Sequence, residues 1–494
     1  MAATSATDPA LEVEGASPPQ RTPAHDPDYV PMGKKLGWSA RALSMAANVI
    51  IMGYFSLYAT DTLGLNPSLV GTLLLASKVF DGVTDLLAGY LIDRTRTRWG
   101  RARPYEFAMI GLWVSIWALF STPASMSDGA KAVWLFLLYT MVNSVFATLA
   151  QSNQALYTAL AFPTRRAIGA VSAFAGLFIS IGAVIVSMLI PQGLEWAGKD
   201  PGRWSMFILC LAIPMGVLGM MRFLTVKETQ PSADDAKDKV TFREIFTALK
   251  GNPWIWLLGA ITVLQNLLLN VGAAAYYFRY VVGNLGLQSL TVGVSLLAVP
   301  VVMVIPPLMK RFKLTSIMLV GQLVNVVGGA VMYFAGVNIP LLVVANLIVA
   351  VGTLPLSYMI GILVIDCATY NEWKGHRRLE SIMGAVQSFA AKLGQGIGMA
   401  LAGAFLAFFG YDGTLDAQPD SAIFAIRALF TWIPAVIALL MALALRAYRL
   451  EDQLPQINEE LAARRAAQTD GVDHHNHEDA EENAPAISAE ENRA

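Results

Sequence analysis

Apolar residues fill most of this chain in long stretches that short polar segments separate. A helix needs roughly 20 apolar residues to cross the hydrocarbon of a bilayer. Twelve stretches reach that length, and they cover residues 36–60, 67–92, 105–125, 132–162, 167–190, 205–223, 253–281, 289–309, 314–335, 338–368, 381–409 and 422–446. The pattern predicts an all-α integral membrane protein with twelve transmembrane helices.

The polar segments divide these stretches into two groups of six. The longest internal segment, residues 225–252, follows the sixth stretch, and its part 240–249 has the apolar spacing of a surface amphipathic helix. We therefore expect an N-terminal six-helix bundle over 34–224, a cytoplasmic linker over 225–252 and a C-terminal six-helix bundle over 253–448. This is the architecture of two-bundle secondary transporters, whose substrate site lies near mid-membrane between the halves.

Both ends of the chain differ from the apolar body. Residues 1–33 are rich in Pro, Ala, Ser and Thr, and residues 451–494 hold twelve acidic residues against three arginines. Segments of such composition bury too little apolar surface to fold. We expect a disordered cytoplasmic N-terminal arm over 1–33 and a disordered acidic cytoplasmic tail over 449–494.

The charges of the loops predict the orientation. Loops after the second, fourth, eighth and tenth stretches carry thirteen Lys and Arg, whereas the loops on the other side carry chiefly Lys131, Lys199, Arg203 and Arg279. Basic loops remain in the cytoplasm. Both termini are therefore expected to be cytoplasmic, in a multi-pass protein of the plasma (inner) membrane.

The composition narrows the possible functions. The chain is 55% hydrophobic and 14% charged with a net charge of -1, so no basic excess points to nucleic acid. Its two cysteines lie in apolar stretches and its five histidines lie outside them, which predicts neither a metal centre nor another cofactor site in the membrane. We expect a monomeric transporter of a small-molecule solute, and not an enzyme.

The second stretch holds the most specific feature. Lys78, Asp81 and Asp85 lie three and four residues apart, which places them on one helix face near mid-membrane. Two carboxylates one turn apart repel each other unless a cation lies between them. With the hydroxyl of Thr84, the pair predicts a site for a coupling cation, either Na⁺ or a shared proton. The alternative is a structural ion pair of Lys78 and Asp81 beside a protonated Asp85.

Other polar groups within the apolar stretches are candidates for a solute path. Lys392 lies near the middle of the eleventh stretch, where a buried cation could sense the aspartates. Neutral polar side chains recur on single helix faces, namely Asn48 in the first stretch, Gln151, Gln154 and Thr158 in the fourth, and Asn266 and Asn270 in the seventh. They could bind a hydroxylated solute, although hydrogen bonds between helices are the commoner reason for such residues.

Two motifs resemble those of a known family. Asp81-Gly82-Val83-Thr84-Asp85 and the later Asp93-Arg94-Thr95-Arg96-Thr97-Arg98-Trp99-Gly100-Arg101-Ala102-Arg103-Pro104 are similar to the D-x-x-T-D and D-R-T-x-x-R-W-G-R-x-R-P signature of the glycoside-pentoside-hexuronide:cation symporters. These are the melibiose-permease relatives of the major facilitator superfamily, and the resemblance covers roughly residues 34–450.

The resemblance implies roles for these residues. Asp81 and Asp85 would bind the coupling cation beside Thr84, and Lys392, with Lys78, would couple the cation to the solute. Gln387 and Ser388 match a pair that touches sugar in melibiose permease. The cytoplasmic gate would consist of Asp93, Arg94, Arg98, Arg101 and Arg103.

The sequence also departs from that family pattern. The first stretch, 36–60, lacks the sugar-binding acid of melibiose permease, the acid of its fourth span is Gln154 here, and the arginine of its fifth span falls near Phe174. Neutral groups that donate and accept hydrogen bonds favour a neutral or singly charged sugar or glycoside. The expected function is cation-coupled symport by alternating access. Alternatives are a lipid-like substrate on the same fold and a scaffold or assembly factor that transports nothing.

Overall fold

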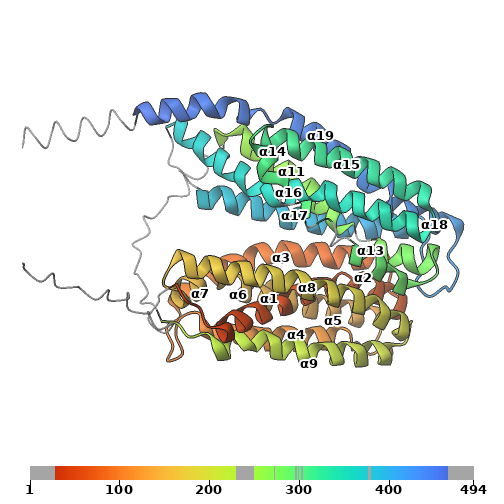
Figure 1. The fold of residues 1–494 in the computed structure, drawn as a ribbon. Helices are drawn as coiled ribbons and strands as arrows, with labels where there is room; N and C mark the ends of the chain where they lie inside the picture. The colour runs from red at the N-terminus through yellow and green to blue at the C-terminus, as the bar shows by residue number, and fades with distance from the viewer. Residues whose placement is uncertain are drawn as a thin grey trace, which may run out of the picture.

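The computed structural model describes residues 28–229, 250–271, 273–294, 298, 300–301, 304–375 and 380–464. Within these ranges the chain is helical, and the only strand-like pairing is an isolated bridge between Thr97 and Gly100. The helices form two halves, α1 to α9 and α11 to α19, which lie side by side (Figure 1). The all-α prediction is confirmed for the described residues.

The first half begins with a long helix and contains two π-helical turns, η1 and η3. Its elements are α1 (Met32–Met52), α2 (Phe55–Leu57), η1 (Tyr58–Thr62), α3 (Pro67–Arg94), η2 (Arg103–Phe107), α4 (Ala108–Leu119), α5 (Asp128–Thr140), η3 (Met141–Ala147), α6 (Thr148–Ser152), α7 (Gln154–Ala161), α8 (Arg165–Ala197) and α9 (Pro201–Thr225).

The second half contains the longest helix, α16, and a third π-helical turn, η4. Its elements are α11 (Pro253–Asn270), α12 (Ala274–Tyr276), η4 (Tyr277–Val281), η5 (Leu285–Leu287), α13 (Gln288–Val294), α14 (Ile305–Met309), α15 (Leu314–Ala335), α16 (Ile339–Trp373), α17 (Glu380–Phe408), α18 (Asp420–Phe430) and α19 (Trp432–Ala447).

Nine helices in the described part of the chain are long and apolar enough to cross a membrane. The predicted stretches 67–92, 105–125 and 289–309 are not among them. The helix α3 covers the first of these but carries charged side chains, α4 has only 12 residues, and the apolar helix Leu285–Val294 is short. The total of twelve spans therefore stays a prediction.

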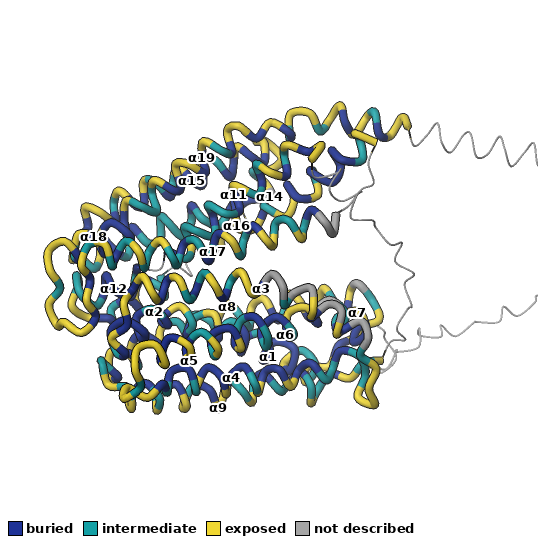
Figure 2. Tube along the Cα trace, turned by 180° about the vertical axis from the view of Figure 1, so that it is seen from behind, coloured by how far each residue is buried: buried dark blue, intermediate teal, exposed yellow. Residues whose placement is uncertain are grey.

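Large apolar side chains cover the outer surface of both halves. Leu177 is 69% exposed, Phe334 is 80% exposed and Phe408 is 82% exposed. Exposed residues recur along the outward faces of the helices, whereas buried residues follow the faces that pack together (Figure 2). A contiguous apolar surface of this kind is stable against lipid chains and unstable against water. The protein is a multi-pass membrane protein.

The start of α3 follows from its sequence. Asn66 precedes the helix, and its side-chain oxygen accepts a hydrogen bond from the backbone N–H of Ser68 at 2.8 Å. Pro67 at the first helical position has no N–H to satisfy and has the backbone angle that a helix needs. The cap fixes the first turn of the helix that carries Asp81.

Glycines allow α3 and α17 to touch across the boundary between the halves. A Cβ atom on Gly71 would lie 3.0 Å from the Cα of Ala400, and one on Gly396 would lie 2.9 Å from the Cδ1 of Leu75. Both distances are shorter than ordinary van der Waals contact, so a larger residue would push the helices apart. Close backbone approach through small residues is a main source of helix association in membranes.

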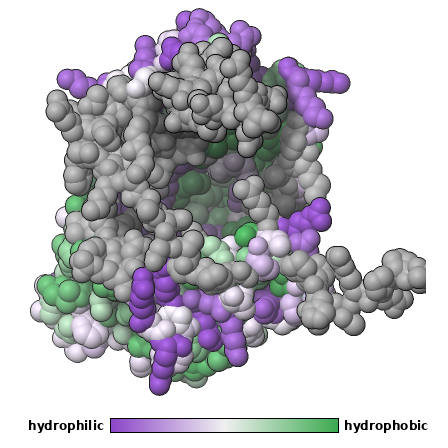
Figure 3. Space-filling model, turned by 90° about the vertical axis from the view of Figure 1, so that its left-hand side faces the viewer, coloured by the Kyte–Doolittle hydropathy of each residue, from purple (hydrophilic) through white to green (hydrophobic). Residues whose placement is uncertain are grey.

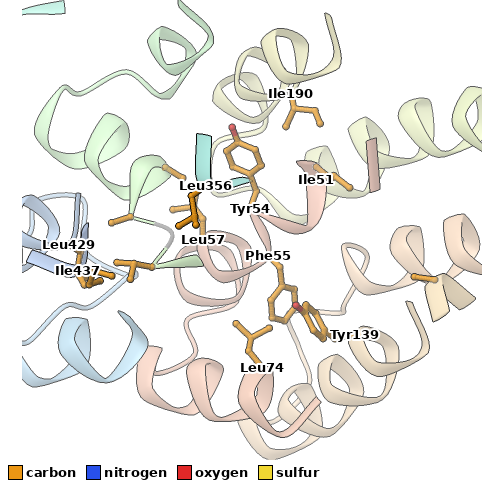
Figure 4. Packing of buried hydrophobic residues seen from close by; sticks show 14 of the residues in the cluster. Ile51, Tyr54, Phe55, Leu57, Leu74, Tyr139, Ile190, Leu356, Leu429 and Ile437 are labelled. Carbon is orange, nitrogen blue, oxygen red and sulfur yellow. The ribbon is translucent and has the colours of Figure 1, made fainter. Parts of the chain in front are cut away.

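The halves meet closely at one end of the molecule, where α1 ends and α3 begins, which we call the closed end. Buried residues from both halves belong to one cluster there (Figure 4). The rings of Phe55 and Tyr139 lie 5.0 Å apart next to Leu74, and the cluster continues to Leu356 and Leu429 of the second half. This core joins the halves into one body.

At the opposite end, where α9 ends and α11 begins, the halves diverge, and we call this the open end. Figure 3 looks into the open end and shows a hollow between the halves. Hydrophobic surface lies in the depth of the hollow, and hydrophilic side chains lie around parts of its rim. The molecule thus has a path into its centre from one end only in this conformation.

The predicted disorder of residues 449–494 is wrong for residues 450–464, which form a helix. Leu450, Ile457 and Leu461 are buried on one face of this helix. Its polar side chains also bind the second half, because Glu460 accepts a hydrogen bond from the indole N–H of Trp373 at 2.6 Å. The acidic composition concealed an apolar stripe with helical spacing.

The start of the chain needs a similar correction. The prediction of a disordered arm over 1–33 fails at its end, because Asp28 accepts a hydrogen bond from Thr164 at 2.6 Å and Val30 is buried. The helix α1 already starts at Met32. Residues 1–27 and 465–494, and the predicted amphipathic helix at 240–249, lie outside the described residues.

Candidate functional site

The carboxylate of Asp81 lies inside the protein, on α3, and is bound by groups from the same half. Asp81 is 3% exposed. The ammonium of Lys78 lies 3.0 Å from its Oδ2, and the hydroxyl of Ser144 donates to its Oδ1. The backbone carbonyl of Asp81 accepts a hydrogen bond from Lys392 on α17 at 3.5 Å. The residue therefore touches both halves of the protein.

The π-helical turn η3 places Ser144 against α3. Thr140, just before this turn, donates to the hydroxyl of Ser77 at 3.2 Å, and Ser144 lies within hydrogen-bond distance of the backbone carbonyl of Ser77 at 3.5 Å. A π turn adds one residue to a helical turn and changes which side chains face a neighbour, and such turns are frequent at functional sites. Sequence reasoning did not identify Ser144 because no local motif marks it.

Other members of the predicted cation site are partly described. The hydroxyl of Thr84 donates to the backbone carbonyls of Asp81 at 3.1 Å and Phe80 at 3.3 Å, which leaves its oxygen lone pairs for another partner. The backbone of Asp85 lies one turn after Asp81 in α3, and its side chain lies outside the described residues. The ligand role of Asp85 stays a prediction.

The electrostatics of the site depend on Lys78. A carboxylate inside a membrane protein is costly unless a positive charge compensates it. Lys78 supplies that charge to Asp81 at 3.0 Å, with its own side chain only 10% exposed. A metal cation that binds Asp81 must compete with this ammonium, and a proton that neutralises Asp81 must release it.

Two of the predicted solute-binding residues belong to a buried network in the first half. The guanidinium of Arg222 donates to both carboxylate oxygens of Glu106 and to the side-chain oxygen of Gln154. Thr158 donates to the backbone carbonyl of Gln154 at 2.7 Å, and Arg41 lies 3.6 Å from Glu106. Gln154 thus supports an internal ion pair, which the sequence pattern did not reveal.

The remaining solute candidates are dispersed. Asn266 and Asn270 donate to carbonyls one turn earlier in α11, at 3.0 and 2.8 Å, and Gln395 donates to Asn266 at 3.4 Å. Asn48 is buried, 3% exposed, and its side-chain oxygen accepts no hydrogen bond. The exposed or half-exposed candidates, for which the structure gives no contact with the others, are Gln151, Gln387 and Ser388.

The described part of the predicted arginine gate is bound within the first half. Glu228, after α9, accepts hydrogen bonds from the backbone N–H groups of Arg101 at 2.9 Å, Ala102 at 2.8 Å and Arg103 at 2.8 Å. Arg103 also donates to the backbone carbonyl of Phe223 at 2.6 Å.

The outer part of the same loop also packs on its own half. The guanidinium of Arg98 stacks on the Trp99 ring, and this ring packs against Phe107 at 5.7 Å between centroids. The side chains of Asp93 and Arg94 lie outside the described residues. The open end of this conformation agrees with a loop that binds no partner across the hollow in its described contacts.

A cavity of about 120 Å³ lies between the halves, next to the closed end. Phe55, Thr60 and Tyr139 line it from the first half, and Asn270 and Tyr276 line it from the second. Its walls combine aromatic rings with hydroxyl and amide groups. Of the predicted solute-binding residues, only Asn270 lines it.

The sequence as a whole was compared with known families. The sequence model of a family described as MFS/sugar transport protein matches residues 39–452. The chain belongs to this family. Relatives named as glycoside/cation symporters place it among the glycoside-pentoside-hexuronide:cation symporters of the major facilitator superfamily, as the signature motifs predicted. Family members are transporters and not enzymes.

Three relatives match this symporter-family protein over most of its length. The isoprimeverose transporter of Lactiplantibacillus pentosus is 29% identical over 90% of the chain and 96% of its own length. A putative glycoside/cation symporter of Escherichia coli is 28% identical over 89% and 96%. A glucuronide carrier protein homolog of the same species is 26% identical over 85% and 92%.

Solved structures agree on the fold of this transporter. A bacterial homolog of the human lysosomal transporter Spinster, in an inward-facing and unoccupied conformation, aligns with a TM-score of 0.60 at 13% identity, over 84% of this chain and 97% of its own. The nucleoside transporter NupG aligns with a TM-score of 0.57 at 13% identity, over 84% and 98%. These likenesses establish the fold alone.

This transporter carries a second buried carboxylate that the sequence analysis missed. Asp61 in η1 has a side chain with 0% exposure, and it lies 3.4 Å from the guanidinium of Arg279. The hydroxyl of Tyr280 donates to it at 2.6 Å, and Tyr411 also donates to it. The first predicted stretch ended at residue 60, one residue before this acid. The pairing of a lone acid with a lone arginine in opposite halves was the available signal.

Proposed function

We propose that this transporter couples the entry of a sugar or glycoside to a cation, Na⁺ or H⁺, by alternating access. The observation that carries the proposal is the buried Asp81, which binds Lys78 through its carboxylate and Lys392 of the other half through its carbonyl. The relatives support the solute class, because their names refer to isoprimeverose, glucuronides and glycosides.

The cation step follows from charge balance at Asp81. With no cation bound, Lys78 neutralises the carboxylate. Binding of Na⁺ at Asp81, or its protonation, releases the ammonium of Lys78, and the altered field acts on Lys392, whose ammonium lies 3.5 Å from the backbone carbonyl of Asp81. Because Lys392 belongs to α17, this change reaches the second half. The cation thereby biases the contact between the halves.

The open end is assigned to the cytoplasm. Basic residues gather in the loops at that end, and such loops remain in the cytoplasm of membrane proteins. They include Arg98, Arg101 and Arg103 after α3 and Lys310 and Lys313 before α15. The conformation is then inward-facing, and both termini are cytoplasmic.

The solute is proposed to bind between the halves, at the cavity beside the closed end. Asn270, Tyr276 and Thr60 offer donors and acceptors there, and Phe55 and Tyr139 offer apolar ring surface. Sugars present hydroxyl groups and apolar ring faces, so both kinds of wall are complementary to them. Gln154 and Thr158 are not part of this solute site, because they bind within the first half.

A lipid-like solute is the second candidate, because the depth of the hollow in Figure 3 is hydrophobic. One experiment distinguishes the two. Purified transporter in proteoliposomes is supplied with a panel of radiolabelled sugars, glycosides and a lysolipid, under an imposed Na⁺ or proton gradient. Gradient-driven accumulation of a sugar supports the proposal. Accumulation of the lysolipid alone supports the second candidate, and accumulation of nothing above Asp81→Asn liposomes contradicts both.

A further inference from the structure

We propose that Asp61 is the centre of the gate that closes the outer end of the transport path, and that Thr60 and Tyr276 link this gate to the solute cavity. The inference rests on the proposed function, in that it needs alternating access and the orientation given above. It concerns residues that lie apart from the Asp81 site, at the closed end.

The gate consists of one acid from the first half and donors from the second. Arg279 and Tyr280 belong to η4, and Tyr411 follows α17. Arg279 lies 3.4 Å from Oδ2 of Asp61, Tyr280 donates to the same oxygen at 2.6 Å, and Tyr411 donates to Oδ1. Apart from its neighbour Thr60, the partners of Asp61 in the described structure all lie across the boundary between the halves.

This geometry makes the contact a two-state element. While the halves touch, the carboxylate of Asp61 is fully buried and its charge depends on Arg279 and the two tyrosines. When the halves separate at this end, all three contacts break together, and water replaces them at both the acid and the arginine. An interface of this kind is stable when closed and tolerates a hydrated open state, whereas a purely apolar seal would not.

Other contacts surround Asp61 at the closed end but are more peripheral. Gln192 donates to Ser289 at 3.2 Å, and the backbone N–H of Leu285 donates to Glu195 at 2.8 Å. These join α8 to η5 and α13 at the edge of the interface. The buried acid at its centre distinguishes the gate from these ordinary surface contacts.

The link to the cavity is a short chain of hydroxyl groups. The hydroxyl of Thr60 lies 2.8 Å from Oδ1 of Asp61 and 3.1 Å from the hydroxyl of Tyr276. Thr60 and Tyr276 both line the cavity between the halves. Each hydroxyl has a single proton to donate. A solute hydroxyl that bonds to Tyr276 or Thr60 therefore changes which acceptor Thr60 serves, and so changes the contact with Asp61.

A labelling experiment without solute tests the gate. Cys210 and Cys367 are replaced by serine, and Ala273, which lines the cavity and is 4% exposed, becomes the reporter Ala273→Cys. A membrane-impermeant maleimide is added outside right-side-out vesicles. Asp61→Asn should raise the labelling rate about tenfold, the scale of one lost charge-assisted hydrogen bond.

Two further variants make this result decisive. Asp128→Asn is the matched control, because Asp128 pairs with Lys131 of its own helix at 3.5 Å, and it should leave the labelling rate unchanged. Arg279→Gln should reproduce the effect, and the double variant with Asp61→Asn should add little beyond either change alone. An unchanged rate in both single variants would overturn the gate, even if uptake of a sugar is demonstrated.

The link is tested by solute addition to the same reporter, with the sugar panel used for uptake. A panel sugar should alter the labelling rate of the otherwise unmodified transporter, and Tyr276→Phe or Thr60→Val should abolish that response. Tyr277→Phe is the control, since the Tyr277 hydroxyl donates to Gly336 of its own half at 2.6 Å. A response retained in Tyr276→Phe and Thr60→Val, or no response to any sugar, would refute the link and leave the gate to be judged by the solute-free rates.

Discussion

Lys78 lies one turn before Asp81 on α3 and holds its ammonium 3.0 Å from the Asp81 carboxylate, at a depth where neither side chain is more than 10% exposed. The pair satisfies its own charges in the absence of a bound ion. Ion coupling then means exchange of one positive charge for another at Asp81. Three of the predictions below follow from this competition.

Replacement of Asp81 by asparagine should abolish cation-driven accumulation of solute. The amide keeps the shape and a hydrogen bond from Ser144 but has no charge for a cation. In proteoliposomes with an imposed gradient, the internal solute concentration should reach the external one and go no further. The exposed Asp420→Asn is the control. Accumulation by Asp81→Asn at the control level would exclude Asp81 from the cation site.

Replacement of Lys78 by methionine should raise the apparent affinity for the coupling cation by roughly tenfold or more, because the competing ammonium is removed. The cation concentration for half-maximal uptake measures this. If Lys78 and Asp81 form only a structural ion pair, the same variant should instead lose thermal stability without any change in cation dependence.

Replacement of Lys392 by alanine should weaken the dependence of uptake on the cation more than it lowers stability. The variant removes the hydrogen bond from α17 to the carbonyl of Asp81, and with it a contact between the halves. Uptake measured over a series of cation concentrations, together with the melting temperature, separates the two effects. Equal cation dependence in Lys392→Ala and the unmodified protein would contradict a coupling role.

Replacement of Glu106 by glutamine should destabilise the first half by about 3–5 kcal/mol, since it leaves the buried Arg222 and Arg41 without their carboxylate. Thermal unfolding of detergent-solubilised protein, followed by tryptophan fluorescence, reports the loss. The matched variant Asp420→Asn should melt like the unmodified protein. A melting temperature unchanged in Glu106→Gln would show that the network contributes no net stability.

Replacement of Glu228 by alanine should free the arginine loop, because three backbone N–H groups lose their shared acceptor. Trypsin added to the cytoplasmic side of inside-out vesicles should then cleave after Arg101 and Arg103 several times faster. Glu459→Ala, which changes an exposed acid of the C-terminal helix, serves as the control. Equal cleavage rates in the two variants would argue that the loop is held by other contacts.

The sequence by itself determined the membrane character, the helical fold and the family. Long apolar stretches permit only helices or closed barrels in lipid, and the stretches here are far too long for strands. The buried group at Asp81 was also predictable, because spacings of three and four residues place Lys78, Asp81 and Asp85 on one helix face whatever their surroundings.

Tertiary structure decided which polar groups meet across distance. Gln154 had the pattern of a solute ligand, but Arg222, 68 residues away, takes its side chain into an ion-pair network. Ser144 reaches Asp81 only because η3 is π-helical. Asp61 and Arg279 are separated by more than two hundred residues and meet only where the halves close. Helical periodicity fixes neighbours along one helix, whereas contacts between helices depend on the packing of the whole chain, which no local pattern records.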